Sequence, residues 1–78
     1  MRKALDDFEA DMIVGGVVYL SDKRMKVGFT TTGETFNLLC DFKDARDLLN
    51  DLYDENSNMS DTAFDSLVKS EFSARGYI

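Results

Sequence analysis

The chain has 78 residues, of which 44% are hydrophobic and 12% aromatic, and its formal net charge is −6. A chain of this length forms one domain that buries only about 60% of its unfolded surface, so a deep core and a large substrate cleft do not fit together. The aromatic content excludes a disordered composition, and the acidic charge opposes direct binding to nucleic acid or to anionic membranes.

The cysteine count and the apolar runs indicate the compartment. A single cysteine, Cys40, excludes an internal disulfide and favours a reducing environment. The first residues lack the apolar stretch of a signal peptide. The longest apolar run, MIVGGVVYL at 12–20, is far shorter than the roughly 20 residues that cross a bilayer. We therefore expect a soluble, cytoplasmic protein with a single domain over residues 1–78.

The chain is predicted to begin with a helix and then a strand. Residues 1–11 form a candidate short helix, because apolar side chains fall on one helical face at Met1, Leu5, Phe8 and Met12. Residues 12–20 are rich in β-branched side chains and predict one strand. Within that strand, Gly15 and Gly16 indicate a bulge or a close approach of the backbone to another segment.

Two alternating segments follow, joined by short turns. In residues 25–32 the inward side chains are Met25, Val27 and Phe29. In residues 35–42 the inward side chains are Phe36, Leu38, Cys40 and Phe42. The turns SDKR and TTGE are short enough to reverse the chain directly, and together the three segments predict an antiparallel meander.

Apolar residues then recur at helical spacing in two segments. The first contains Ala45, Leu48, Leu49, Leu52 and Tyr53, and the second contains Ala63, Phe64, Leu67, Val68 and Phe72. Ser60 or Asp61 is the expected cap of the second helix, and Gly76 is its expected stop. The predicted fold class is α+β: a three-stranded antiparallel meander followed by two amphipathic helices packed on one sheet face.

The first helix carries a row of acidic residues beside its apolar arc. At 100° per residue they fall within about 100° of one another, with successive carboxylates about 4.5–6 Å apart along the axis. A solvated outer face explains this row, and so does a surface that binds a basic partner. Acids in the last turn favour the second interpretation, because the helix dipole disfavours them there. The row consists of Asp44, Asp47, Asp51, Asp54 and Glu55.

Residues 54–65 match part of an EF-hand-like calcium loop. Met59 replaces the turn glycine and Asp65 replaces the bidentate glutamate of such a loop. Helix capping and turn chemistry explain the same polar residues, so we predict no metal site. The residues that occupy the ligand positions are Asp54, Asn56, Asn58, Ser60, Thr62 and Asp65.

The sequence offers no catalytic constellation. It contains no histidine, the commonest general base and metal ligand. Cys40 is predicted to be a buried structural thiol without a base beside it. Gly15 and Gly16 lie within a strand and do not open a phosphate-binding loop. We therefore predict that the protein is not an enzyme and uses no cofactor.

Three further features concern surfaces. Val14, Val18, Leu20 and Leu39 are predicted on the second sheet face, where a leading helix with Leu5 and Phe8 covers them or they form an apolar patch for dimerisation or a protein partner. Glu71 and Arg75 have the spacing of an ion pair at the domain edge, or they mark a contact with a partner. Tyr77 and Ile78 are expected to pack against the end of the last helix.

The plan resembles that of small phage-encoded anti-CRISPR proteins. The resemblance covers residues 12–76 as architecture, size and charge, with a sheet that passes through the corner CDFKDARDLL into a helix pair. It implies inhibition by binding to a basic surface or subunit interface of a nucleic-acid-handling complex. We therefore expect a non-enzymatic inhibitor that binds its protein partner through Asp44, Asp47, Asp51, Asp54 and Glu55. The alternative is a small structural or regulatory interaction module, self-associating through the sheet face around Val18, Leu20 and Leu39.

Overall fold

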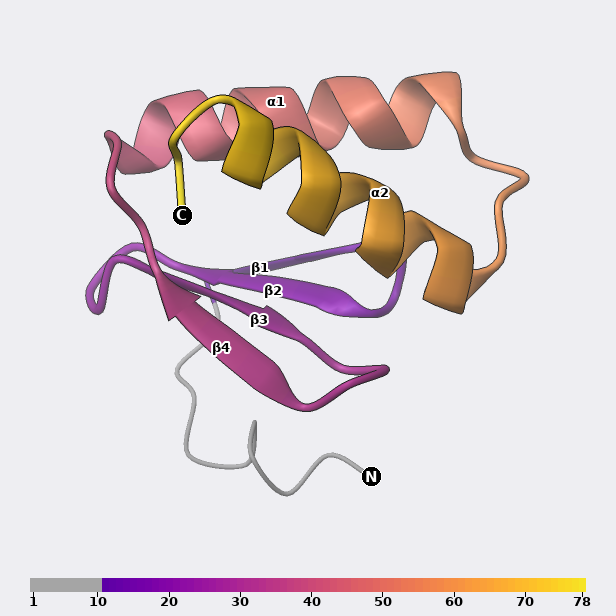
Figure 1. Cartoon of the computed structure of the whole chain (residues 1–78), viewed down its shortest axis with the longest axis horizontal. Coiled ribbons are helices and arrows are strands. Elements are labelled where there is room, and N and C mark those ends of the chain that lie inside the picture. The colour runs from indigo at the N-terminus through magenta and orange to yellow at the C-terminus, as the bar shows by residue number, and fades with distance from the viewer. Residues whose placement is uncertain (1–10) are drawn as a thin grey trace.

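The computed structural model describes residues 11–78 and has an α+β fold (Figure 1). Four antiparallel strands lie in chain order in one sheet: β1 (Met12–Val14), β2 (Val18–Ser21), β3 (Lys26–Phe29) and β4 (Glu34–Asn37). Two helices, α1 (Phe42–Glu55) and α2 (Asp61–Ala74), pack on one face of this sheet. The predicted class and the two-helix layer are confirmed. The helix expected in residues 1–11 lies, apart from its last residue, outside the described residues.

The sheet has four strands and not the predicted three, because the segment 12–20 folds back on itself. Val14 pairs with Val18, so the intervening residues form a tight turn. Gly15 and Gly16 have φ of 70° and 77°, a region that glycine adopts without steric cost and that hairpin turns require. The single-strand prediction is therefore wrong. The predicted close approach is confirmed, since a Cβ on Gly15 would lie 3.0 Å from the ring of Phe64.

The faces of β1 and β2 also differ from the prediction. Leu20 pairs with Val27, and Val18 pairs with Phe29. Directly opposed residues of an antiparallel pair share a face, so β2 points its apolar residues at the helices. Val14, Val18 and Leu20 accordingly belong to the buried core. The predicted apolar patch around Val18, Leu20 and Leu39 does not exist, because only Leu39 is exposed, with 69% of its surface accessible.

The sheet face away from the helices is formed by the residues that alternate along each strand with those of the core. Ile13, Tyr19, Gly28 and Thr35 form one cross-strand row on that face. Ile13 is 55% exposed. The proposed cover by Leu5 and Phe8 lies outside the described residues.

The predicted strand 35–42 ends early. β4 stops at Asn37, a bend follows, and α1 already begins at Phe42. Asp41 has the extended backbone of an N-cap residue. The predicted alternation still describes the burial, because Leu38 is buried and Leu39 is exposed. The bend turns the chain from the sheet edge toward the helix layer.

The apolar faces of the helices meet the sheet as predicted. The core contains Ala45, Leu49 and Leu52 from α1, and Phe64, Val68 and Phe72 from α2. Two members of the predicted arcs, Tyr53 and Ala63, are exposed. Tyr53 nevertheless packs its ring edge against Phe64, with 5.8 Å between the ring centroids.

The ends of α2 follow the predicted capping chemistry. The Ala63 amide donates to the Ser60 hydroxyl across 3.2 Å. At the other end Gly76 has φ of 77°, its amide donates to the Ser73 carbonyl, and the Tyr77 amide donates to the Phe72 carbonyl. This is a Schellman stop, and the Tyr77 ring packs on Phe72 as its apolar contact. The Tyr77 carbonyl also accepts a hydrogen bond from the Leu39 amide, which ties the chain end to the bend after β4.

Candidate functional site

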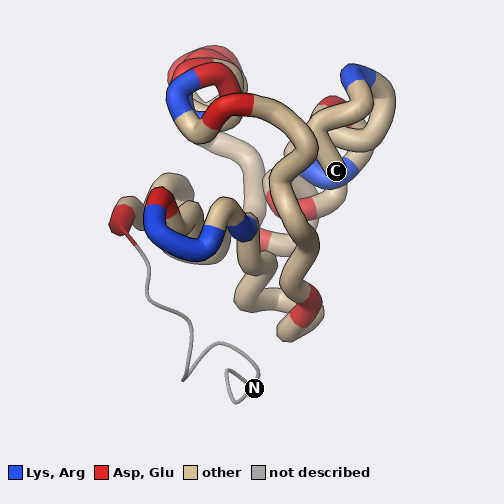
Figure 2. The backbone as a smooth tube through the Cα atoms, turned by 90° about the vertical axis from the view of Figure 1, so that its left-hand side faces the viewer, with Lys and Arg blue, Asp and Glu red and all other residues tan. Residues whose placement is uncertain are grey.

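The acidic row predicted on α1 lies on the solvent side of the helix. Figure 2, which looks along α1, shows acidic positions at the outer corner of the molecule with a basic segment beside them. α1 holds five acidic and two basic residues, a net charge of −3 over 14 residues. Every acid of the row is exposed, and we call them the acidic face: Asp44, Asp47, Asp51, Asp54 and Glu55.

The two basic residues of α1 neutralise only one part of the acidic face. Lys43 Nζ lies 3.3 Å and Arg46 lies 3.6 Å from the carboxylate of Asp47. Exposed pairs of this kind contribute about 0–1 kcal/mol. No residue between 11 and 78 forms an ion pair with the other four acids of the face. Their charge is therefore available to a partner.

The last turn of α1 is the least favourable place in the helix for acids. Asp54 and Glu55 lie there, and the turn contains no basic residue. The partial negative charge of the helix C-terminus disfavours carboxylates by about 0.3–1 kcal/mol. Since both side chains are exposed, core packing does not require them. Neither packing nor the helix dipole therefore accounts for acids in this turn.

The structure does not bring the calcium-loop positions together. The Asn56 side chain donates to the Leu52 carbonyl across 2.9 Å, and the Ser60 hydroxyl caps α2. Asp65 lies inside α2 and faces the core. No group of three or more acidic or cysteine side chains within residues 11–78 is placed to hold a metal ion. Capping explains the polar residues of this loop.

Asp65 is the polar side chain that sequence reasoning misplaced. It is 4% exposed, and its Oδ2 accepts hydrogen bonds from the Thr31 amide (3.2 Å) and the Thr31 hydroxyl (2.5 Å). Burial raises the pKa of this carboxyl, and the Thr31 hydrogen bonds offset part of that rise. A helical wheel contained the signal: at 100° per residue Asp65 falls about 20° from Phe72, at the edge of the apolar arc.

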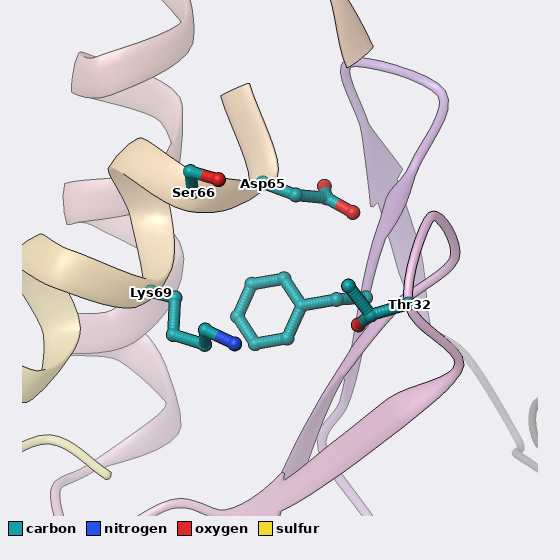
Figure 3. Close-up of a pocket in the computed structure, with 5 residues that line it drawn as sticks. Thr32, Asp65, Ser66 and Lys69 are labelled. Carbon is teal, nitrogen blue, oxygen red and sulfur yellow. The ribbon is translucent and has the colours of Figure 1, made fainter. Parts of the chain in front are cut away.

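A small pocket of about 20 Å³ lies beside Asp65, between α2 and the β3–β4 hairpin (Figure 3). Lys69 borders it and donates to Glu34 across 2.7 Å, with its Nζ 5.9 Å from the centre of the Phe36 ring. The lysine holds the pKa of the exposed Glu34 carboxyl below its ordinary value. The pocket has room for about one water molecule, too little for an organic substrate. It is lined by Phe29, Thr32, Asp65, Ser66 and Lys69.

Three other predicted residues, Cys40 and the pair Glu71 and Arg75, have modest roles. Cys40 is half-buried in the bend after β4, and burial, followed by the charges of Asp44 and Asp41, raises its thiol pKa. The thiol is therefore not activated as a nucleophile. Glu71 and Arg75 form the predicted ion pair at 3.5 Å near the end of α2, with 38% and 51% of their side-chain surfaces exposed.

Comparison of the chain with protein-family models, curated proteins and solved structures finds no match. Neither α1 nor α2 is long and apolar enough to cross a bilayer, and these are the helices within residues 11–78.

Proposed function

We propose that the protein is a non-enzymatic binding inhibitor of a nucleic-acid-handling complex of the CRISPR defence type. The observation that supports this is the acidic face: five exposed carboxylates on one rigid helix, four of them without an ion-pair partner among residues 11–78. The face places its carboxylates over about 16 Å of helix axis. Lysine and arginine side chains that neutralise phosphates form the complementary kind of surface.

Rigidity is the second argument for a binding surface. α1 is anchored by Ala45, Leu49 and Leu52, which are buried in the core. The acids on its outer side therefore project from a fixed backbone, and binding orders only their side chains. A row of like charges also steers a basic partner during diffusion, which raises the association rate at low salt. The partner is a protein with a basic surface, and the net charge of −6 opposes direct contact with nucleic acid or membranes.

The test uses purified CRISPR effector complexes loaded with guide RNA, and measures their binding to target DNA in a mobility-shift assay with and without the protein. We expect inhibition that weakens as salt rises, because the contacts are electrostatic. A triple variant, Asp51→Asn, Asp54→Asn and Glu55→Gln, should lose the inhibition. The matched control, Asp22→Asn, Asp61→Asn and Glu71→Gln, removes the same charge away from α1 and should keep it. Equal loss in both variants, or no inhibition of any complex, would refute the proposal.

A further inference from the structure

The contact between α2 and the β3–β4 hairpin contains a feature that the proposed function does not use. Asp65 is 4% exposed, and its Oδ1 is buried without a hydrogen bond from any of residues 11–78. Native proteins rarely leave a buried carboxylate oxygen unpartnered, because such a group has lost its hydration without replacement. In Figure 3 the Asp65 carboxyl extends from α2 toward the hairpin.

The same carboxyl is the polar link that holds the hairpin loop. Both Thr31 donors, the amide at 3.2 Å and the hydroxyl at 2.5 Å, bond to Oδ2 of Asp65. Thr31 itself is exposed, so it can turn to water when this link opens. Opening would also hydrate both oxygens of Asp65. The Asp65 carboxyl is therefore easier to ionise in the open state, where water reaches it, than in the closed state, where it is buried.

We propose that Asp65 and Thr31 form a proton-operated latch, which closes the β3–β4 loop onto α2 most firmly when the carboxyl carries a proton and loosens when it ionises. In the closed, neutral state a proton taken up from solvent lies on Oδ1, the oxygen without a partner, while the Thr31 amide and hydroxyl still donate to Oδ2. The 2.5 Å separation of the two oxygens is that of a short O–H···O bond. The carboxyl is then uncharged, and an uncharged carboxyl is less costly to bury than a carboxylate.

The charged groups around the latch divide into two kinds. Asp61, one turn earlier on α2, raises the Asp65 pKa by its negative charge, and Lys69, one turn later, lowers it. Lys69 is held by Glu34 on β4. This second bridge between α2 and the hairpin has the opposite response, because Glu34 loses its charge and its attraction to Lys69 as the pH falls. It is exposed and should weaken with salt, whereas the buried latch should not.

The latch obeys a simple linkage. The equilibrium constant for opening the latch is larger at high pH than at low pH. The increase is tenfold for each unit by which the Asp65 pKa of the closed state exceeds that of the open state. Hydrogen exchange of the Thr31 amide reports opening directly, since this amide is a donor in the latch. Chemical shifts of the Asp65 carboxyl carbon report its protonation.

The experiment is an NMR titration of the full chain between about pH 3 and 8. We expect the Asp65 carboxyl and the Thr31 amide to titrate with one shared midpoint above the ordinary aspartate value, and Thr31 protection, corrected for intrinsic exchange, to fall through the same range. Asp65→Asn should abolish the Thr31 titration. The proposal would be overturned by an Asp65 midpoint at or below the ordinary aspartate value. It would also be overturned if the Thr31 amide signal and its protection did not change as Asp65 titrates.

Milder variants keep the test decisive if Asp65→Asn fails to fold. Thr31→Val retains the amide but removes the hydroxyl. The hydrogen bond from that hydroxyl lowers the Asp65 pKa, so its loss should raise the midpoint of the Asp65 titration. Lys69→Met should also raise it, and Asp61→Asn should lower it. An unchanged midpoint in all three would show that these groups do not govern the latch.

Discussion

Asp51 on α1 and Asp65 on α2 are the same amino acid in opposite settings. Asp51 is exposed on the acidic face, whereas Asp65 is 4% exposed and bonded to Thr31. Each lies on an amphipathic helix that covers the same sheet. The difference comes only from the angle at which each side chain leaves its helix relative to the apolar arc. Charge on the outer side is available for binding, and charge on the inner side is coupled to folding.

The largest effect is expected on the inner side. Phe72→Ala, which removes a fully buried ring beside Asp65 on the helical wheel, should lower the free energy of unfolding by about 3–5 kcal/mol. Asp51→Ala on the outer face should change it by less than about 0.5 kcal/mol. Urea unfolding followed by circular dichroism measures both. Similar losses for the two variants would show that the acidic face is part of the folding core.

The close packing of Gly15 on α2 gives the second effect. Gly15→Ala should cost about 1–3 kcal/mol, because alanine is strained at φ of 70° and its Cβ would lie 3.0 Å from the Phe64 ring. Gly16→Ala is the matched control, since its φ is 77° but nothing lies within 4 Å of the added Cβ. The difference between the two unfolding free energies isolates the steric contact. No difference would mean that the Phe64 ring moves aside freely.

The sequence predicted the helices and their faces because their apolar spacing is long and regular. Leu49, Val68 and Phe72 are buried where the spacing puts them. It failed at the pair Gly15 and Gly16, where a bulge and a tight turn have the same local composition. The pairing of Val14 with Val18 decides between them, and that is a tertiary property. From this one error followed the wrong face for β2 and the self-association surface that the structure does not form.

The acidic face and the buried Asp65 carboxyl show how far helical spacing can predict a candidate site. Helical spacing alone predicted that the acidic face is exposed to solvent. The structure adds that, of the five acids in this face, only Asp47 has ion-pair partners among residues 11–78. Helical spacing puts Asp65 at the edge of the apolar arc of α2, a signal that the sequence analysis missed, and its partner Thr31 is 34 positions away in the chain. Local spacing cannot specify a contact of that range. The strand register and helix packing create it.

The pH dependence of stability should report the buried carboxyl of Asp65. The pKa of Asp65 is raised in the folded state, so its contribution is complete below the unfolded pKa, near 3.9, and decreases as the pH rises through the folded pKa. Asp65→Asn should remove this decrease from a plot of unfolding free energy against pH. A curve for Asp65→Asn that parallels the original would contradict the assignment.

The smallest effect concerns the two ends of the acidic face, and it tests the face against the helix dipole. Glu55→Lys puts a base in the last turn of α1 and should raise the free energy of unfolding by about 0.3–1 kcal/mol. Asp44→Lys makes the same charge change in the first turn and should lower it by a similar amount, because that end of the helix favours an acid. Both variants should weaken binding to a basic partner equally at low salt. Opposite effects on stability with equal effects on binding would show that Glu55 is retained for its surface charge and against the preference of its own helix. Stability changes of the same sign at both ends would instead attribute them to the net charge of the chain.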